Sequence, residues 1–240
     1  MLTSLRFILL LPLLAACTTL SQNVDLSCGD AGPNTLYFPA GTFFDQDYKD
    51  EKSGREADAF AREWYSPHLQ AMHEPSLSCG PSAATESYRF LWLPTFDQPV
   101  AVRISRFDKR FTLDAVILNG GGGYDPGSIE KKIHRDLTAA EWSRAIAALG
   151  RVNFTELPTV ERWFITPDPD TGDEVFISTN DGTTVIVEGR SDTYHVVERH
   201  EELTDLRYVS LTFLDLAGIP ISEGERESLD YSVRRPTETP

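Results

Sequence analysis

The chain has 240 residues, with 22 basic and 37 acidic side chains, and therefore a formal net charge of −15. Hydrophobic residues make up 40% of it, enough for one domain with a hydrophobic core, so we exclude a disordered, a collagen-like and a small disulfide-stapled chain. The acidic excess argues against nucleic acid as a partner, because phosphate binding requires clustered Lys and Arg side chains.

The first 17 residues have the pattern of a secretory signal. Arg6 supplies one positive charge, the run Phe7–Ala16 is apolar, and Cys17 follows it. This run is half as long as the roughly 20 residues that a membrane-spanning helix needs. Leu14-Ala15-Ala16-Cys17 resembles the lipobox of bacterial lipoproteins, which implies cleavage before Cys17 and lipidation of its thiol. The alternative is an ordinary signal peptide, residues 1–16, followed by a chance cysteine.

The lipobox resemblance also implies a location. Residues 17–27 then form a lipidated polar tether, and Thr18 after the cysteine implies the outer membrane of a Gram-negative cell, with the domain facing the periplasm. Several acyl chains anchor a protein stably, because each buried CH₂ contributes about 0.8 kcal/mol. The mature chain has lost one Arg and no acidic residue, so 21 basic and 37 acidic side chains give it a charge of −16.

Two further cysteines, Cys28 and Cys79, remain after processing, and we expect them to form a disulfide. The periplasm is oxidising, and two cysteines allow a single bridge. Closing a loop of about 50 residues stabilises a fold by roughly 4 kcal/mol in the chain-entropy model. A metal site is the weaker alternative, since neither a CxxC spacing nor a nearby Cys/His set accompanies the pair.

Helical periodicity marks the region between these two cysteines. Four apolar residues recur at helical spacing: Ala57, Phe60, Ala61 and Trp64. Ser66-Pro67 predicts the end of that helix and the start of a second one, which carries Leu69 and Met72 and ends near Glu74-Pro75.

From Ser87 onward the hydrophobic period changes to two residues, which is typical of strands. Asn119–Gly127 interrupts the pattern and is expected to form a long flexible loop, whereas Asp181-Gly182 predicts a tight hairpin turn. Six strands are expected in all: residues 88–93, 100–105, 111–117, 175–179, 184–188 and 194–198.

Two helices are expected among and after these strands. Thr138-Ala-Ala-Glu141 is a capping box, and it begins a helix that ends at Gly150. The closing helix begins near Thr204 and stops at Gly218, after which residues 221–240 form a polar, disordered tail. The pattern predicts a single α+β domain over residues 28–220, with an antiparallel sheet of about six strands and helices packed on one face.

Three groups of residues carry a wider resemblance. They are Trp64-Tyr65-Ser66 through Leu69 to Glu74-Pro75-Ser76-Leu77, then Gly122–Gly127, then Glu188-Gly189 with Tyr194–Arg199. Together they resemble uncharacterised bacterial secreted proteins and lipoproteins over residues 60–218. The resemblance implies a shared fold, and it brings no activity and no catalytic residue.

The most conspicuous motif is a glycine run that ends in an aromatic residue: Gly120, Gly121, Gly122, Gly123 and Tyr124. A dinucleotide fingerprint requires its glycines between a strand and the immediate start of a helix. Here the capped helix begins only at Thr138, so we expect a loop and no cofactor.

Metal binding has two weak candidates. His68 and His73 lie five residues apart and do not share a helix face, so we expect surface histidines. The carboxylates of Asp168–Glu174 alternate as in a calcium loop, but the twelfth position is Thr179 instead of Glu. We therefore expect a solvated turn and no metal centre, with loose cation binding as the alternative.

Glu188, His195 and Arg199 form the best candidate polar cluster. On a hairpin closed near Ser191-Asp192, Glu188 would lie opposite His195, and Arg199 would share their face. A carboxylate beside an imidazole can tune it for proton transfer or ligand binding. The alternative is a cross-strand ion pair on the solvent face of the sheet.

No Gly-x-Ser-x-Gly elbow and no HExxH pair occurs in the sequence. We therefore expect an outer-membrane lipoprotein with a non-enzymatic binding or structural role in the cell envelope. Its partners are the membrane, through Cys17, and an envelope protein. The alternative is an envelope hydrolase, or a small-ligand or cation-binding module, that uses Glu188, His195 and Arg199.

Overall fold

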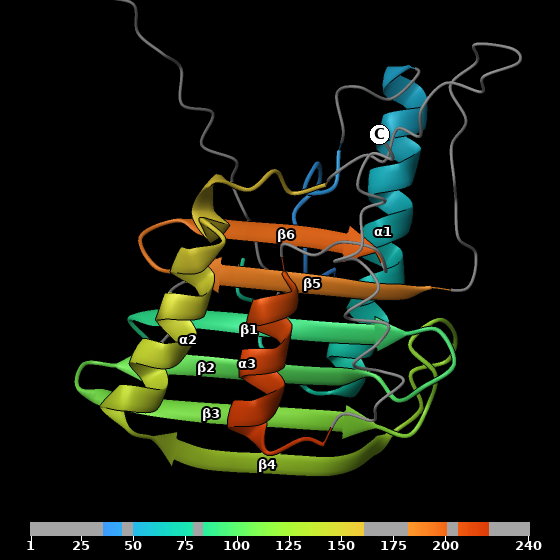
Figure 1. The fold of residues 1–240 in the computed structure, drawn as a ribbon. Coiled ribbons are helices and arrows are strands. Elements are labelled where there is room, and N and C mark those ends of the chain that lie inside the picture. The colour runs from blue at the N-terminus through green and yellow to red at the C-terminus, as the bar shows by residue number, and fades with distance from the viewer. Residues whose placement is uncertain (1–35, 45–49, 79–83, 161–181, 201–205, 221–240) are drawn as a thin grey trace, which may run out of the picture.

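One six-stranded antiparallel sheet forms the centre of the computed structural model, which describes residues 36–44, 50–78, 84–160, 182–200 and 206–220 (Figure 1). The strands lie in the order β4-β3-β2-β1-β5-β6, so β5 returns to pair with β1 after a meander of four strands. Their bounds are β1 Glu86–Pro94, β2 Val100–Phe107, β3 Arg110–Leu118, β4 Ile129–Leu137, β5 Thr183–Arg190 and β6 Tyr194–His200. The predicted α+β class and antiparallel sheet are confirmed.

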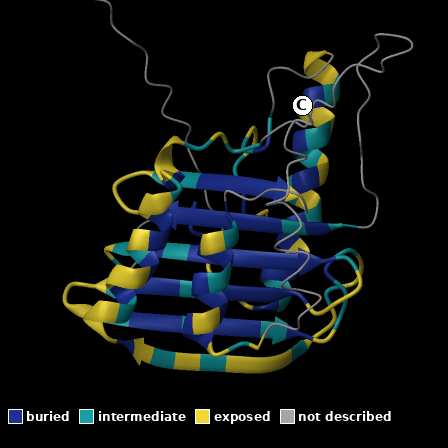
Figure 2. Cartoon of the chain, viewed as in Figure 1, coloured by how far each residue is buried: buried dark blue, intermediate teal, exposed yellow. Residues whose placement is uncertain are grey.

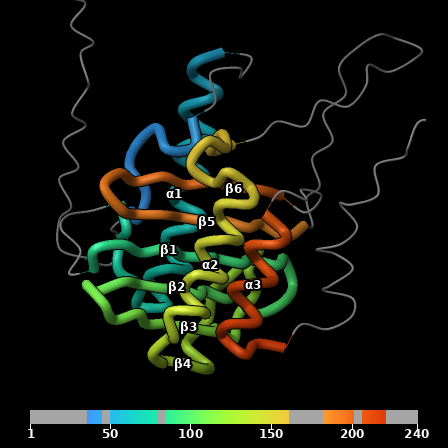
Figure 3. The backbone as a smooth tube through the Cα atoms, turned by 60° about the vertical axis from the view of Figure 1, so that its left-hand side comes forward, coloured from blue at the N-terminus to red at the C-terminus, as the bar shows by residue number. Residues whose placement is uncertain are grey.

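Helices cover both faces of this sheet. Helices α2 (Ala139–Arg151) and α3 (Arg207–Ala217) lie together on one face, whereas α1 (Glu51–Ala71) crosses the other (Figures 1 and 3). The sequence analysis predicted all helices on one face, and this prediction is wrong for α1. The reason is visible in β1, where successive residues 90–93 are all buried and therefore need cover on both sides.

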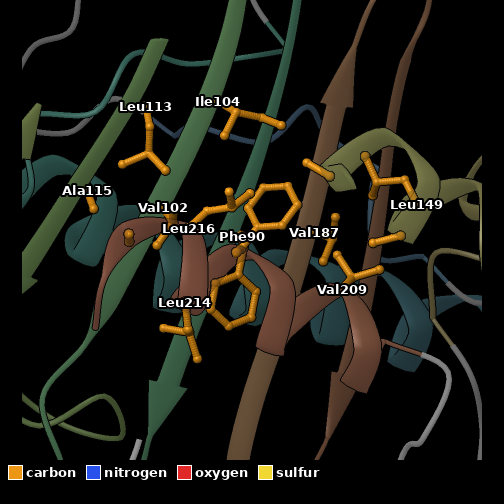
Figure 4. Packing of buried hydrophobic residues seen from close by; sticks show 14 of the residues in the cluster. Phe90, Val102, Ile104, Leu113, Ala115, Leu149, Val187, Val209, Leu214 and Leu216 are labelled. Carbon is orange, nitrogen blue, oxygen red and sulfur yellow. The ribbon is translucent and has the colours of Figure 1, made fainter. Parts of the chain in front are cut away.

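The face under α2 and α3 carries an apolar core (Figure 4). Phe90 and Val187 from the central strands meet Leu149 of α2 and Val209 of α3. The predicted capping box of α2 is confirmed, because the backbone N–H of Glu141 donates to the Thr138 hydroxyl at 3.2 Å and the Glu141 carboxylate accepts from the Thr138 N–H at 2.8 Å. The glycine stop of α3 is also confirmed, with Gly218 in the left-handed region at φ 64°.

The face under α1 carries a second apolar cluster, to which the segment 36–44 contributes Phe38 and Phe43. Helix α1 is continuous, so the prediction of two helices broken at Ser66-Pro67 is wrong. Pro67 removes one backbone hydrogen bond. Tyr65 and Leu69, on either side of it, are both buried in the same cluster, and this packing holds the helix together across the proline.

Strand β4 lies at one edge of the sheet, over residues for which the sequence analysis predicted neither a strand nor a helix. Five of its nine residues are exposed, which Figure 2 shows as the mostly yellow strand. Charged side chains such as Lys131 and Lys132 are typical of edge strands, where they oppose pairing with other chains. These charges hid the apolar face of the strand, on which Ile133 and Leu137 pack against the α2/α3 cluster.

Several predictions lie outside the described residues. They are Cys17, Cys28 and Cys79, the strand 175–179, the candidate calcium loop Asp168–Glu174 and the tail 221–240. Among the helices that the structure describes, none has the length and hydrophobicity needed to cross a membrane.

Candidate functional site

The predicted cluster of Glu188, His195 and Arg199 does not assemble. The hairpin closes through the three-residue loop 191–193, so Glu188 pairs with Val196 and not with His195. A shift of one residue moves a side chain to the other face of a sheet. Glu188 therefore lies on the α1 face, whereas His195 and Arg199 lie on the α2/α3 face.

His195 and Arg199 instead hold the segment that follows α2 against β6. The His195 ring meets Phe154 of the short helix η1 (Phe154–Glu156) edge-on, with 5.0 Å between ring centroids. The buried Arg199 guanidinium donates to the carbonyl oxygens of Pro158 at 3.0 Å and Thr159 at 3.3 Å. Burial lowers the pKa of His195, so its neutral form is favoured.

Glu188 belongs to a different polar assembly, which we call the charged row. Its members lie directly opposite one another on five neighbouring strands of the α1 face. They are Glu188 on β5, Arg89 on β1, Arg103 on β2, Asp114 on β3 and His134 on β4.

The inner end of the charged row is fully buried. Arg89 has no exposed surface, and its Nε donates to Glu188 at 2.8 Å while another guanidinium nitrogen donates to the Pro75 carbonyl at 2.7 Å. The second Glu188 oxygen accepts from the Tyr194 hydroxyl at 2.8 Å. Glu74, just beyond α1, also contacts Arg89, so the row fastens the chain after α1 to the sheet.

The outer end opens toward solvent. Arg103 joins the two ends, because its Nε donates to Glu74 at 2.9 Å and its guanidinium lies 3.2 Å from Asp114. Asp114 in turn lies 2.6 Å from Nδ1 of His134. The exposed fraction of the side chain rises from 16% at Arg103 to 28% at Asp114 and 60% at His134.

The protonation states of the buried groups suit a structural role. Burial and the neighbouring Glu188 charge raise the pKa of Tyr194 well above its usual value. The phenol therefore stays protonated, and its O–H group donates a hydrogen bond to Glu188. Burial alone would disfavour the charge of Arg89, but Glu188 and Glu74 outweigh it and raise the pKa. Tyr65 of α1 is held in the same way, by burial and then by Glu198, to which it donates. These groups are held in one protonation state each, which is the opposite of what proton transfer needs.

His68 was predicted on the surface and is buried, with 1% of its area exposed, whereas His73 is exposed as expected. Nδ1 of His68 lies 3.2 Å from the Trp64 carbonyl, one turn earlier in α1. Burial lowers the pKa of His68, although the Gly121 backbone and the Asp125 carboxylate act against this effect. The described residues contain no group of three or more His, Cys, Asp or Glu side chains that could hold a metal ion.

The glycine run lies between β3 and β4 and is fastened to the connection between β1 and β2. The backbone N–H groups of Gly122 and Gly123 donate to the carbonyls of Asp97 and Thr95, both at 3.0 Å. A Cβ atom on Gly122 would lie 2.5 Å from the Pro94 carbonyl oxygen, so this position requires glycine. The expected long flexible loop is thus held by backbone hydrogen bonds, and these two N–H groups are engaged by the protein itself.

One motif was missed in the sequence. Ser128-Ile-Glu-Lys131 has the Ser-x-x-Lys spacing of some serine hydrolases, in which a helical turn brings the two side chains together. Here Ile129–Lys131 belong to β4, where successive side chains alternate between faces, and the Ser128 N–H donates to Asn119 at 2.8 Å. This geometry does not present Lys131 to Ser128 as a base.

Comparisons with known proteins add no family or activity to this geometry. No protein-family model matches the chain, and no curated protein matches it significantly.

Proposed function

We propose that the chain is a lipid-anchored lipoprotein of the bacterial outer membrane, with a periplasmic domain that binds or supports another envelope component without catalysis. The observation that carries the anchor is the sequence Leu14-Ala15-Ala16-Cys17 directly after the apolar run Phe7–Ala16. Thr18 at the following position supports the outer membrane over the inner one. The sulfur atom of Cys17 would carry the lipid.

The roles of the polar side chains support the non-enzymatic part of this proposal. Glu188 is engaged by Arg89 and Tyr194, and His195 and Arg199 serve the opposite face of the sheet. General acid–base catalysis needs titratable groups that share a site and exchange a proton near neutral pH. The hydrolase alternative that depended on these three residues therefore loses its active site.

The anchor is tested by the Cys17→Ala variant of the full chain, expressed in a Gram-negative host grown with labelled palmitate. We expect the variant to incorporate no label and to leave the outer-membrane fraction. The matched control is Cys28→Ala, which also removes one thiol but keeps the lipobox, and which should be labelled like the wild type. Label or unchanged outer-membrane fractionation in Cys17→Ala would refute the proposal.

A further inference from the structure

Two aromatic side chains project into solvent at the end of the sheet where the β1–β2 and β3–β4 connections lie. Phe96 is 70% exposed and Tyr124 is 60% exposed, and their ring centroids lie 5.9 Å apart with 34° between the planes. The two residues come from connections 28 positions apart in sequence, and Figure 1 shows these connections leaving the same end of the sheet. We call Phe96 and Tyr124 the aromatic pair.

The backbone beneath the aromatic pair is fixed. The N–H groups of Gly122 and Gly123 donate to the β1–β2 connection on either side of Phe96, and Thr95 in turn donates its N–H to Gly182 at 3.2 Å. A Cβ atom on Gly123 would lie 2.8 Å from the Thr95 side chain, so the two connections are in close contact. The rings are therefore held on a preorganised base, which lowers the entropy lost when a partner binds.

Charge indicates what such a surface would bind. Each ring is followed in sequence by an exposed carboxylate, Asp97 after Phe96 and Asp125 after Tyr124. Residues 95–99 and 119–128 contain no Lys, Arg or His. Aromatic faces attract cations, and neighbouring carboxylates add direct charge complementarity. The surface is thus complementary to a positively charged group and repels an anionic one.

We propose that the aromatic pair, with Asp97 and Asp125, is the docking site for a basic segment of a partner protein, whose Arg or Lys side chains lie over the rings. The inference rests on the proposed function only in making that partner an envelope protein. A second copy of this chain is disfavoured because its formal charge is strongly negative, and an anionic membrane surface is disfavoured for the same reason.

The test is a titration of the purified full chain, in uncharged detergent at physiological ionic strength, with a fluorescent hexa-arginine peptide followed by anisotropy. A hexaglutamate peptide measures the charge requirement. We expect hexa-arginine to bind and hexaglutamate not to bind. The variants Phe96→Ala/Tyr124→Ala and Asp97→Asn/Asp125→Asn should each weaken hexa-arginine binding at least tenfold. Asn at position 125 keeps the oxygen that accepts from the Gly127 N–H at 2.7 Å.

Matched controls separate a site from general attraction to an acidic protein. Phe60→Ala removes a ring that is 64% exposed elsewhere, on α1, and Asp108→Asn/Asp192→Asn changes the net charge by the same two units as the site variant. Both should change the affinity less than twofold, and circular dichroism should show every variant folded. An equal loss in site and control variants would overturn the proposal. It would also be overturned if the aromatic pair were needed for vesicle binding or self-association but not for peptide binding.

This experiment measures binding in solution and does not depend on lipidation. A negative titration with an intact anchor would refute the docking site alone. A failed Cys17 test together with specific peptide binding would refute the anchor alone.

Discussion

The two faces of the sheet are stabilised by different kinds of interaction. The α2/α3 face is an almost uninterrupted apolar core, in which Phe213 and Leu214 of α3 have no exposed surface. The α1 face combines an apolar cluster with the charged row, where Arg89 and Glu188 are equally buried. Both faces exclude water, but the α1 face does so around a buried ion pair, whereas the α2/α3 face buries the Arg199 guanidinium against backbone carbonyls at the edge strand β6.

The difference follows from what covers each face. Two helices with continuous apolar stripes cover the first, whereas α1 ends before the charged row and is followed there by Glu74 and Pro75. An irregular segment leaves polar backbone groups that need partners. Arg89 supplies one by donating to the Pro75 carbonyl, and Glu188 balances its charge. On the α1 face, the buried ion pair thus lies where the cover is an irregular segment instead of the helix.

The largest expected effects test whether the two faces contribute comparably to stability. Arg89→Met should lower the free energy of unfolding by about 3–5 kcal/mol, because it leaves Glu188 buried without its cation. Phe213→Ala should lower it by about 3–5 kcal/mol through lost burial and a cavity. Urea denaturation followed by circular dichroism measures both changes.

Two further variants make this comparison sharper. Arg106→Met removes a cation that is 39% exposed and 2.9 Å from Glu86, and should change stability by less than about 1 kcal/mol. Arg89→Met/Glu188→Leu should recover part of the loss, since it removes the buried carboxylate as well and leaves Glu74 paired with Arg103. If Arg89→Met is no worse than Arg106→Met, the charged row does not stabilise the α1 face.

A smaller effect compares a close-packed glycine in the β3–β4 connection with an exposed glycine in α2. Gly122→Ala should lower the free energy of unfolding by about 1–3 kcal/mol, because the new methyl group would lie 2.5 Å from backbone atoms of Leu93 and Pro94. Gly150→Ala, in α2 on the other side, meets nothing within 4 Å and should raise stability by about 0.5–1 kcal/mol through better helix propensity. Thermal and urea denaturation of the pair measure the contrast, and equal effects would contradict it.

Local sequence signals were sufficient for the helices that cover the first face. The Thr138–Glu141 capping box and the Gly218 stop depend on residues within one turn of each other, so they could be predicted without the fold. The proline in α1 misled the prediction, because packing against the sheet overrides a local break. Strand β4 was missed because an edge strand buries too little to display a hydrophobic pattern.

The candidate site could not be predicted in the same way. Arg89 and Glu188 are 99 positions apart and meet only because β5 pairs with β1, which is a property of the strand order. The predicted pairing of Glu188 with His195 failed by a single residue of hairpin register, and that was enough to separate the two side chains by the thickness of the sheet. A pattern of alternation predicts which residues share a strand face, but not which strands are neighbours.

The smallest expected effect concerns pH and compares two histidines, the buried His68 of α1 and the half-buried His195 of β6, on opposite faces of the sheet. Burial lowers the pKa of both below the ordinary value of 6.5, so each side chain takes up a proton more readily in the unfolded chain than in the folded one. The contribution of each histidine to the free energy of unfolding is therefore full above about pH 6.5 and is lost as the pH falls through the lowered pKa values.

His68→Gln should make the melting temperature less dependent on pH between 7.5 and about 5.5, a range that brackets the unfolded pKa. His195→Gln should do the same for the other face. If only one of the two substitutions alters the slope, the contribution of these histidines at mildly acidic pH comes from that face alone.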